Sequence, residues 1–114
     1  MELWHNPRCT KSRQAKELLD GRGVSYTERR YLDDPPSAAE LDAALTAMGR
    51  EPWEITRMGE PVAAELGLKG MTHDRQAWIE LLVANPILIE RPILVTDDGR
   101  AAVGRPTEAL EPLL

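Results

Sequence analysis

Apolar residues recur along the chain either in short runs, as in buried strands, or at the three-to-four-residue spacing of helices that bury one face. Residues 11–20 follow the second pattern, because Ala15, Leu18 and Leu19 share one side and mostly polar side chains occupy the other. Ile-Leu-Val-Thr at 93–96 is the strongest strand pattern. The patterns predict strands at 2–5, 24–32, 93–96 and 100–103, and helices at 11–20, 38–48, 51–58, 60–66, 74–83 and 107–113.

Turn and cap residues set the ends of several of these elements. Ser37, followed three residues later by Glu40, has the form of a capping box and marks the start of the second long helix. Gly49 is expected to end that helix, since glycine adopts the left-handed conformation found just past helix C-termini. Asp-Asp-Gly at 97–99 has the chemistry of a hairpin turn, which predicts that the last two strands form an antiparallel pair.

The predicted order is strand, helix, strand, then a block of helices, two strands and a final helix. The first three elements form a βαβ unit, which favours a parallel pair because such crossovers join parallel strands. We therefore expect an α/β fold in a single domain covering residues 1–114, with helices inserted at about 37–85.

Composition and charge argue against several other classes of protein. With 42% hydrophobic and 29% charged residues, the chain is expected to fold around a core. No apolar stretch approaches the roughly 18 residues of a membrane span. The first residues lack the regions of a signal peptide and a lone cysteine fits a reducing compartment, so a cytoplasmic location without a membrane partner is expected. The net charge of −5 argues against a nucleic-acid partner.

The only cysteine, Cys9, lies between the first predicted strand and the first predicted helix, in the segment His-Asn-Pro-Arg-Cys-Thr-Lys-Ser-Arg. Backbone N–H groups and the dipole at a helix start stabilise an anion. Arg8, Lys11 and Arg13 add positive charge, and such surroundings lower a thiol pKa from about 8.5. A lone cysteine can also be a small buried apolar residue, but its place at a helix start favours a thiolate nucleophile.

Ser12 occupies the position three residues after Cys9, where a second cysteine would allow an internal disulfide. The oxidised form of Cys9 must therefore be resolved by a thiol from outside the chain. His5 has two open roles: it lowers the thiol pKa or moves a proton near pH 7, or it holds the loop backbone. Asn6 and Ser12 are expected to orient the loop. No metal site is expected, because His73 has no His or Cys partner at ligand spacing.

Residues 5–13 resemble the active-site loop of the glutaredoxin-linked arsenate reductases and their relatives, whose pattern is His-Asn-Pro-x-Cys-x-x-Ser-Arg. Similar segments follow in the same order over nearly the whole chain. They lie at 31–37, 57–68, 85–93 and 104–108. The resemblance implies a thioredoxin/glutaredoxin-like fold with a small mixed four-stranded sheet and a helical insertion between the second and third strands.

The resemblance also implies which residues act. Cys9 is expected to be the nucleophile. The oxyanion is expected to bind to Arg57, Arg91 and Arg105, and Pro92 is expected to follow Arg91 through a cis peptide bond. Guanidinium groups suit a tetrahedral oxyanion because they offer paired donors. Arg91 and Arg105 also each precede a proline at the start of a predicted element, where their side chains can point to the sheet edge near Cys9.

The implied function is reduction of arsenate to arsenite through the Cys9 thiolate. Glutathione is the expected co-substrate and glutaredoxin the expected partner, with no bound cofactor. Two positions depart from the best-known reductases: the loop reads Cys-Thr-Lys-Ser where they have Cys-Gly-Thr-Ser, and Met58 follows Arg57 where a basic residue is expected. Two alternatives stay open. One is a non-enzymatic, Spx-like transcription regulator that binds RNA polymerase, and the other is a monothiol reductase that acts on another substrate.

Overall fold

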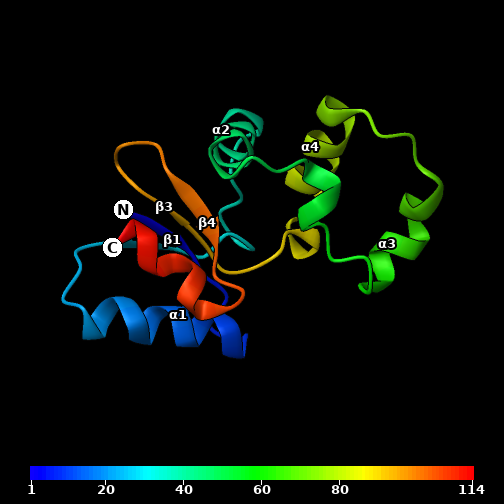
Figure 1. Cartoon of the computed structure of the whole chain (residues 1–114). Coiled ribbons are helices and arrows are strands. Elements are labelled where there is room, and N and C mark those ends of the chain that lie inside the picture. The colour runs from blue at the N-terminus through cyan, green and yellow to red at the C-terminus, as the bar shows by residue number, and fades with distance from the viewer.

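The computed structural model describes all residues from Met1 to Leu114. Four strands form one mixed sheet at its centre (Figure 1). They are β1 (Glu2–Trp4), β2 (Thr27–Arg29), β3 (Ile93–Val95) and β4 (Ala101–Val103). The order across the sheet is β2-β1-β3-β4; β1 is parallel to β2 and antiparallel to β3, and β3 and β4 form the expected hairpin. The small mixed four-stranded sheet is therefore confirmed.

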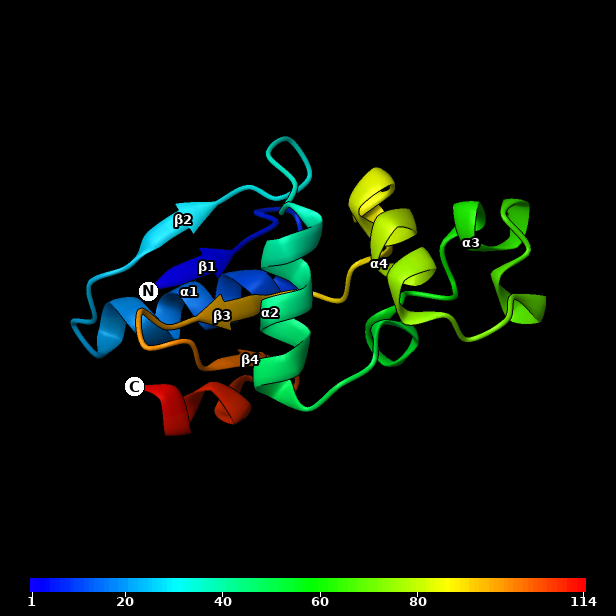
Figure 2. The same cartoon turned by 90° about the horizontal axis from the view of Figure 1, so that it is seen from above.

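Helices cover both faces of this sheet and extend beyond it. α1 (Thr10–Gly21) and the C-terminal 3-10 helix η4 (Thr107–Leu113) lie on one face, and α2 (Ala38–Met48) crosses the other (Figures 1 and 2). α3 (Pro61–Glu65) and α4 (Arg75–Ala84) project past the sheet, within the insertion between β2 and β3 (Figure 2). The same insertion contains three 3-10 helices, η1 (Pro52–Ile55), η2 (Leu68–Gly70) and η3 (Pro86–Leu88). None of the helices is long and apolar enough to span a membrane.

Alternation of side chains along the strands divides the core into two parts. Leu3 and Leu94 point to one face, where they pack with buried residues of α1 and η4. Trp4 and Ile93 point to the other face. There they belong to a larger cluster that also contains residues of α2 and Trp78 of α4. Since neighbouring residues of a strand face opposite sides of a sheet, these three-residue strands serve both clusters.

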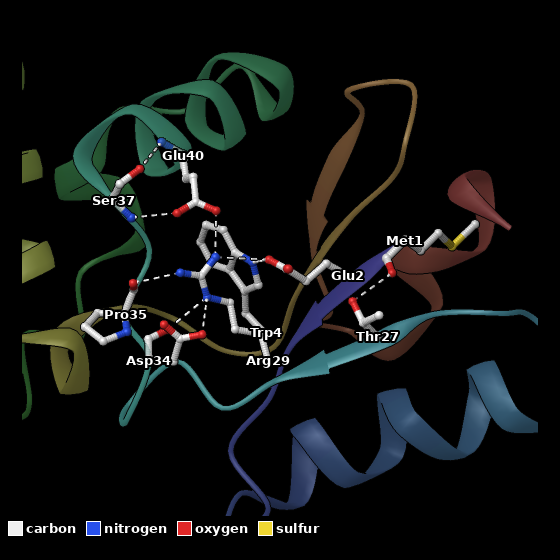
Figure 3. Close-up of polar contacts among 9 residues, drawn as sticks. All are labelled: Met1, Glu2, Trp4, Thr27, Arg29, Asp34, Pro35, Ser37 and Glu40. Carbon is white, nitrogen blue, oxygen red and sulfur yellow. Dashed lines mark hydrogen bonds and ion pairs between the residues drawn. The ribbon is translucent and has the colours of Figure 1, made fainter.

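A polar network fixes the start of α2 against the edge of the sheet (Figure 3). The Ser37 hydroxyl accepts from the Glu40 N–H at 3.1 Å, and the Glu40 carboxylate accepts from the Ser37 N–H at 2.9 Å, so the expected capping box is present. The guanidinium of Arg29, in β2, contacts Glu40 at 2.6 Å and Glu2 at 3.3 Å, and donates to the Pro35 carbonyl at 2.8 Å. One arginine thereby connects β1, β2 and α2.

Most of the predicted elements are confirmed, and α1, α2, β3 and β4 end within one residue of their expected limits. The predicted second strand is wrong in extent, because it covers only Thr27–Arg29 of the residues 24–32. It is an edge strand whose only neighbour, β1, is equally short. The chain then turns, where the N–H groups of Asp33 and Asp34 both donate to the Arg30 carbonyl.

Replacing Ser37 with alanine removes the hydroxyl that caps α2 and leaves the Glu40 N–H without its partner. We expect the free energy of unfolding to fall by about 1 kcal/mol, the usual value of an N-cap side chain. Urea denaturation of the variant and the original protein measures the difference. Ser25→Ala is the matched control, because Ser25 is exposed and lies outside any helix; an equal loss in both variants would contradict the capping role.

Candidate active site

Cys9 lies at the start of α1, in the short loop that follows β1. It is the N-cap residue, with an extended backbone (φ −94°, ψ 125°), and it is only 9% exposed. Its own N–H donates to the Asn6 carbonyl at 2.9 Å, which closes the loop. The N–H groups of Lys11 and Ser12 point to the sulfur. The thiol therefore occupies the anion-binding position that a helix N-terminus provides.

Burial and positive charge act on the thiol in opposite directions. Burial raises the pKa of Cys9, because it disfavours the charged thiolate. The Arg91 guanidinium and the N–H groups of Ser12 and Lys11 lower it, and together they outweigh burial and bring the pKa to about 7. A substantial fraction of the molecules therefore carries a thiolate at neutral pH, which is the reactive form of cysteine.

Two of the three predicted arginines lie directly beside the thiol. The Arg105 Nη2 atom lies 3.6 Å from the Cys9 sulfur, and its Nε donates to the Arg91 carbonyl at 2.7 Å. Arg91 also faces Cys9, and its buried Nε and Nη1 atoms have no carboxylate or carbonyl partner within the protein. The Arg91–Pro92 peptide bond is cis, as the resemblance implies, and the Arg105–Pro106 bond is cis as well.

Arg57 joins this group through Glu90, a residue that sequence reasoning did not single out. The Glu90 carboxylate lies 3.2 Å from Arg57 Nη1 and 2.9 Å from Arg105 Nε. Arg57 also contacts Glu60 at 3.2 Å. The only signal for Glu90 in the sequence is its position directly before Arg91. Arg57 is therefore connected to the thiol through a chain of ion pairs and makes no direct contact with it.

Backbone pairing between distant segments brings Arg57 and Glu90 together. The Glu90 N–H donates to the Ile55 carbonyl at 2.8 Å, and the Arg57 N–H donates to the Leu88 carbonyl at 2.7 Å. Two concave regions meet at Glu90. One, of about 400 Å³, also includes Arg57 and the other, of about 310 Å³, also includes Arg105. These two regions thus expose Arg57, Glu90 and Arg105, and neither is lined by Cys9 or Arg91.

His5 is buried next to the loop but is bound to a different partner. Its Nε2 atom lies 3.2 Å from the Glu28 carboxylate, and its Nδ1 atom has no hydrogen-bond partner within the protein. Burial lowers the pKa of His5, although Glu28 opposes this. His5 is not among the groups with the largest effects on the pKa of Cys9. A catalytic role for His5 stays a prediction, and the residue that the structure places against it is Glu28.

The supporting residues hold the loop and the strand behind it. Ser12 is fully buried, and its hydroxyl accepts from the Asn6 N–H at 3.3 Å. The Asn6 carboxamide oxygen accepts from the Arg8 N–H at 3.0 Å. On the neighbouring strand the Pro92 carbonyl accepts from the Gly104 N–H at 2.8 Å. These contacts fix the positions of Cys9 and Arg91 on adjacent strand ends.

One more residue of this site was missed by sequence reasoning. Tyr31 lies in the turn after β2 and is fully buried, and its hydroxyl faces Arg91 and has no acceptor for its proton within the protein. Its segment contributed to the resemblance, but nothing in the local pattern separates it from an ordinary core tyrosine. No cluster of three or more His, Cys, Asp or Glu side chains is arranged to hold a metal ion.

The pH dependence of alkylation at Cys9 tests this arrangement. We expect the rate of reaction with iodoacetamide to have its midpoint near pH 7, the pKa of the thiol. Arg91→Ala should move the midpoint upward, toward the free-thiol value of about 8.5, because the variant loses the cation that stabilises the thiolate. Arg100→Ala, on the exposed hairpin turn, is the control and should leave the midpoint unchanged. A midpoint near 8.5 in the original protein would contradict an activated thiol.

Comparison with known proteins gives further information on this site. The ArsC family pattern matches residues 4–113. The chain is 38% identical to an arsenate reductase of Neisseria meningitidis serogroup B over 115 residues, which cover all of this chain and 97% of that protein. It is 50% identical to an uncharacterized protein in the glnII region of Streptomyces viridochromogenes, over all of this chain and 98% of that protein.

A solved structure agrees with these matches. That of an arsenate reductase from Vibrio cholerae has a TM-score of 0.91 to this chain at 34% identity, covering 100% of this chain and 98% of that one. The thioredoxin-like α/β fold implied by the resemblance is thereby confirmed. Because the family match spans the Cys9 loop and all three arginines, and continues nearly to the end of the chain, this protein belongs to the ArsC family.

Proposed function

We propose that this protein is a thiol-dependent oxidoreductase that reduces arsenate to arsenite, with glutathione and glutaredoxin as the source of electrons. The observation that carries the proposal is a buried thiol with a pKa of about 7 beside an arginine whose buried donors lack a carboxylate or carbonyl partner within the protein. Its relatives named arsenate reductase, from Neisseria meningitidis and Vibrio cholerae, support arsenate as the substrate.

The charge and geometry of the site suit a tetrahedral oxyanion. Buried donor atoms without a carboxylate partner are costly, so an anion that reaches Arg91 Nε and Nη1 gains more than one bound at the surface. Arg91 and Arg105 approach Cys9 from separate segments and can hold different oxygens of one anion. Arginine also offers paired, planar donors that match such oxygens better than an ammonium group.

The proposed first step is attack of the Cys9 thiolate on arsenic(V). A sulfur–arsenic bond forms, an arsenic–oxygen bond breaks, and the leaving hydroxide takes up a proton and departs as water. Arg91 and Arg105 stabilise the negative charge on the remaining oxygens, because donors fixed in advance need no reorganisation during the reaction. The N–H groups of Lys11 and Ser12 stabilise the thiolate before attack.

Glutathione then supplies the second thiol. Its sulfur forms a disulfide with the Cys9 sulfur, the electron pair of the sulfur–arsenic bond passes to arsenic, and arsenite leaves. Arsenic gains two electrons and the two sulfurs together lose two. The chain has one cysteine, and the buried Ser12 stands where an internal resolving thiol would be. A glutaredoxin thiolate is therefore proposed to attack the glutathione sulfur and release the Cys9 thiolate.

The test of this function is a coupled assay that contains glutathione, glutaredoxin, glutathione reductase and NADPH. We expect NADPH oxidation that depends on arsenate, and its loss in Cys9→Ser, which removes the nucleophile. The same assay of the original protein without glutathione is the control. It should show no turnover, because glutathione supplies the thiol that follows Cys9 in the proposed order. Absence of arsenate-dependent turnover would refute arsenate reduction, and recovery of RNA polymerase in a pull-down would then favour the regulator alternative.

The arginines should contribute unequally to that activity. We expect Arg91→Ala to lower kcat/KM for arsenate by about 10²- to 10³-fold, as loss of a buried transition-state donor does. Arg57→Ala should cost roughly 10-fold or less, because Arg57 is part of a partly exposed ion-pair chain and does not touch Cys9. Steady-state kinetics over a range of arsenate concentrations measures both.

Arg100→Ala again serves as the control for the loss of a positive charge, since Arg100 is exposed on the hairpin turn. It should retain the original kcat/KM. Full activity in Arg91→Ala, or equal losses in Arg57→Ala and Arg91→Ala, would contradict the assignment of Arg91 as the inner donor.

A further inference from the structure

Tyr31 combines complete burial with an unsatisfied polar atom. It lies in the turn that follows β2, its exposure is 0%, and its ring belongs to the larger core cluster, together with Trp4, Ile89 and Ile93. Its hydroxyl oxygen faces the Arg91 guanidinium, and its proton has no acceptor within the protein. Buried hydroxyl groups are nearly always paired, because leaving one unpaired costs free energy. A phenylalanine would fill the same space without that cost.

The hydroxyl of Tyr31 lies among the groups of the active site. The groups that shift the pKa of Tyr31 include Arg91, Arg57 and Cys9. After burial, Arg91 has the largest effect on that pKa. Two atoms of Arg91, Nε and Nη1, are also buried and have no carboxylate or carbonyl partner. The hydroxyl proton of Tyr31 therefore has no acceptor, and the buried Arg91 donors beside it face only Cys9 and Tyr31. A single ligand that carries several acceptor oxygens can satisfy all of them.

We propose that Tyr31 binds the oxyanion substrate by donating a hydrogen bond from its hydroxyl to an oxygen of the anion held at Cys9 and Arg91. This inference rests on the proposed function. Burial raises the pKa of Tyr31, so the hydroxyl keeps its proton and remains a donor at neutral pH. The arginines bind the anion as positively charged donors. Tyr31 adds a neutral donor, which leaves the net charge around the thiolate unchanged.

The donor role makes opposite predictions for stability and for binding. In the protein without anion the hydroxyl proton has no acceptor, so Tyr31→Phe should unfold at the same temperature or higher, since removing a buried donor that is unpaired is neutral or stabilising. In the complex with anion the same change removes a hydrogen bond to a charged acceptor. A tyrosine needed only for packing would affect neither measurement in this way.

The other tyrosine of the chain supplies a matched control. The Tyr26 hydroxyl donates to Asp20 at 2.7 Å and accepts from Lys16 at 3.1 Å, next to α1. Tyr26→Phe therefore removes a partnered hydroxyl away from Cys9. It should lower the unfolding temperature slightly and leave anion binding unchanged, the reverse of the result expected for Tyr31→Phe.

The experiment measures arsenate binding by titration calorimetry without glutathione, thermal unfolding with and without arsenate, and the pH midpoint of Cys9 alkylation. For Tyr31→Phe we expect arsenate to bind roughly 10- to 100-fold more weakly, the range for a hydrogen bond to a charged group. Its stabilisation by arsenate should shrink accordingly. The alkylation midpoint should stay near pH 7, because Tyr31 contributes no charge.

Each other outcome overturns the inference. Unchanged arsenate affinity in Tyr31→Phe removes the donor role and leaves the proposed function intact. A lower unfolding temperature of Tyr31→Phe without anion shows that the hydroxyl already has a partner in the free protein. A midpoint shifted away from pH 7 shows that Tyr31 acts through the thiol. If the original protein binds no arsenate, both the inference and the proposed function fail.

Discussion

The site depends on a half-buried guanidinium group beside a thiol. Arg91 faces Cys9 and Tyr31, and no carboxylate pairs with its buried Nε and Nη1 atoms. Since a buried charge without a partner is unfavourable, the surrounding backbone has to hold Arg91 in place. The Arg91 carbonyl accepts from Arg105 at 2.7 Å, and the N–H of Glu90, one residue earlier, donates to Ile55 at 2.8 Å. These hydrogen bonds to other segments thereby offset the free-energy cost of holding Arg91 beside Cys9 before an anion binds.

Acidic residues decide which arginines remain available. The chain carries a net charge of −5, yet Arg91 and Arg105 lie beside the thiol and Arg57 is linked to them through Glu90. Glu90 binds Arg57 and Arg105 on the outer side, and Glu60 binds Arg57 again. These carboxylates fix the two outer guanidinium groups and offset their positive charge, whereas Arg91 has no acidic partner among the ion pairs of the chain. The free positive charge is thus concentrated at the innermost arginine, next to the reacting sulfur.

The sequence was sufficient to predict the elements whose ends are determined by capping or turn residues at those ends. Ser37 and Glu40 predicted the start of α2, and the Asp-Asp-Gly turn at 97–99 predicted the hairpin. The extent of β2 could not be predicted in this way, because it depends on pairing with a strand more than twenty residues earlier. The same holds for Glu90 and Tyr31, whose importance comes from contacts between segments far apart in the chain. The reactive thiol could be recognised from the sequence because the helix start that surrounds Cys9 is formed by its neighbours in the chain.

The balance between burial and charge at Cys9 has a further chemical consequence. A very low pKa would give a complete thiolate but a poor nucleophile, since the nucleophilicity of a thiolate falls as its pKa falls. The attacking thiol is most effective when its pKa is near the ambient pH. Burial opposes Arg91 and the helix N–H groups and brings the pKa of Cys9 to about 7. The partial burial of the sulfur therefore keeps it reactive as well as positioned.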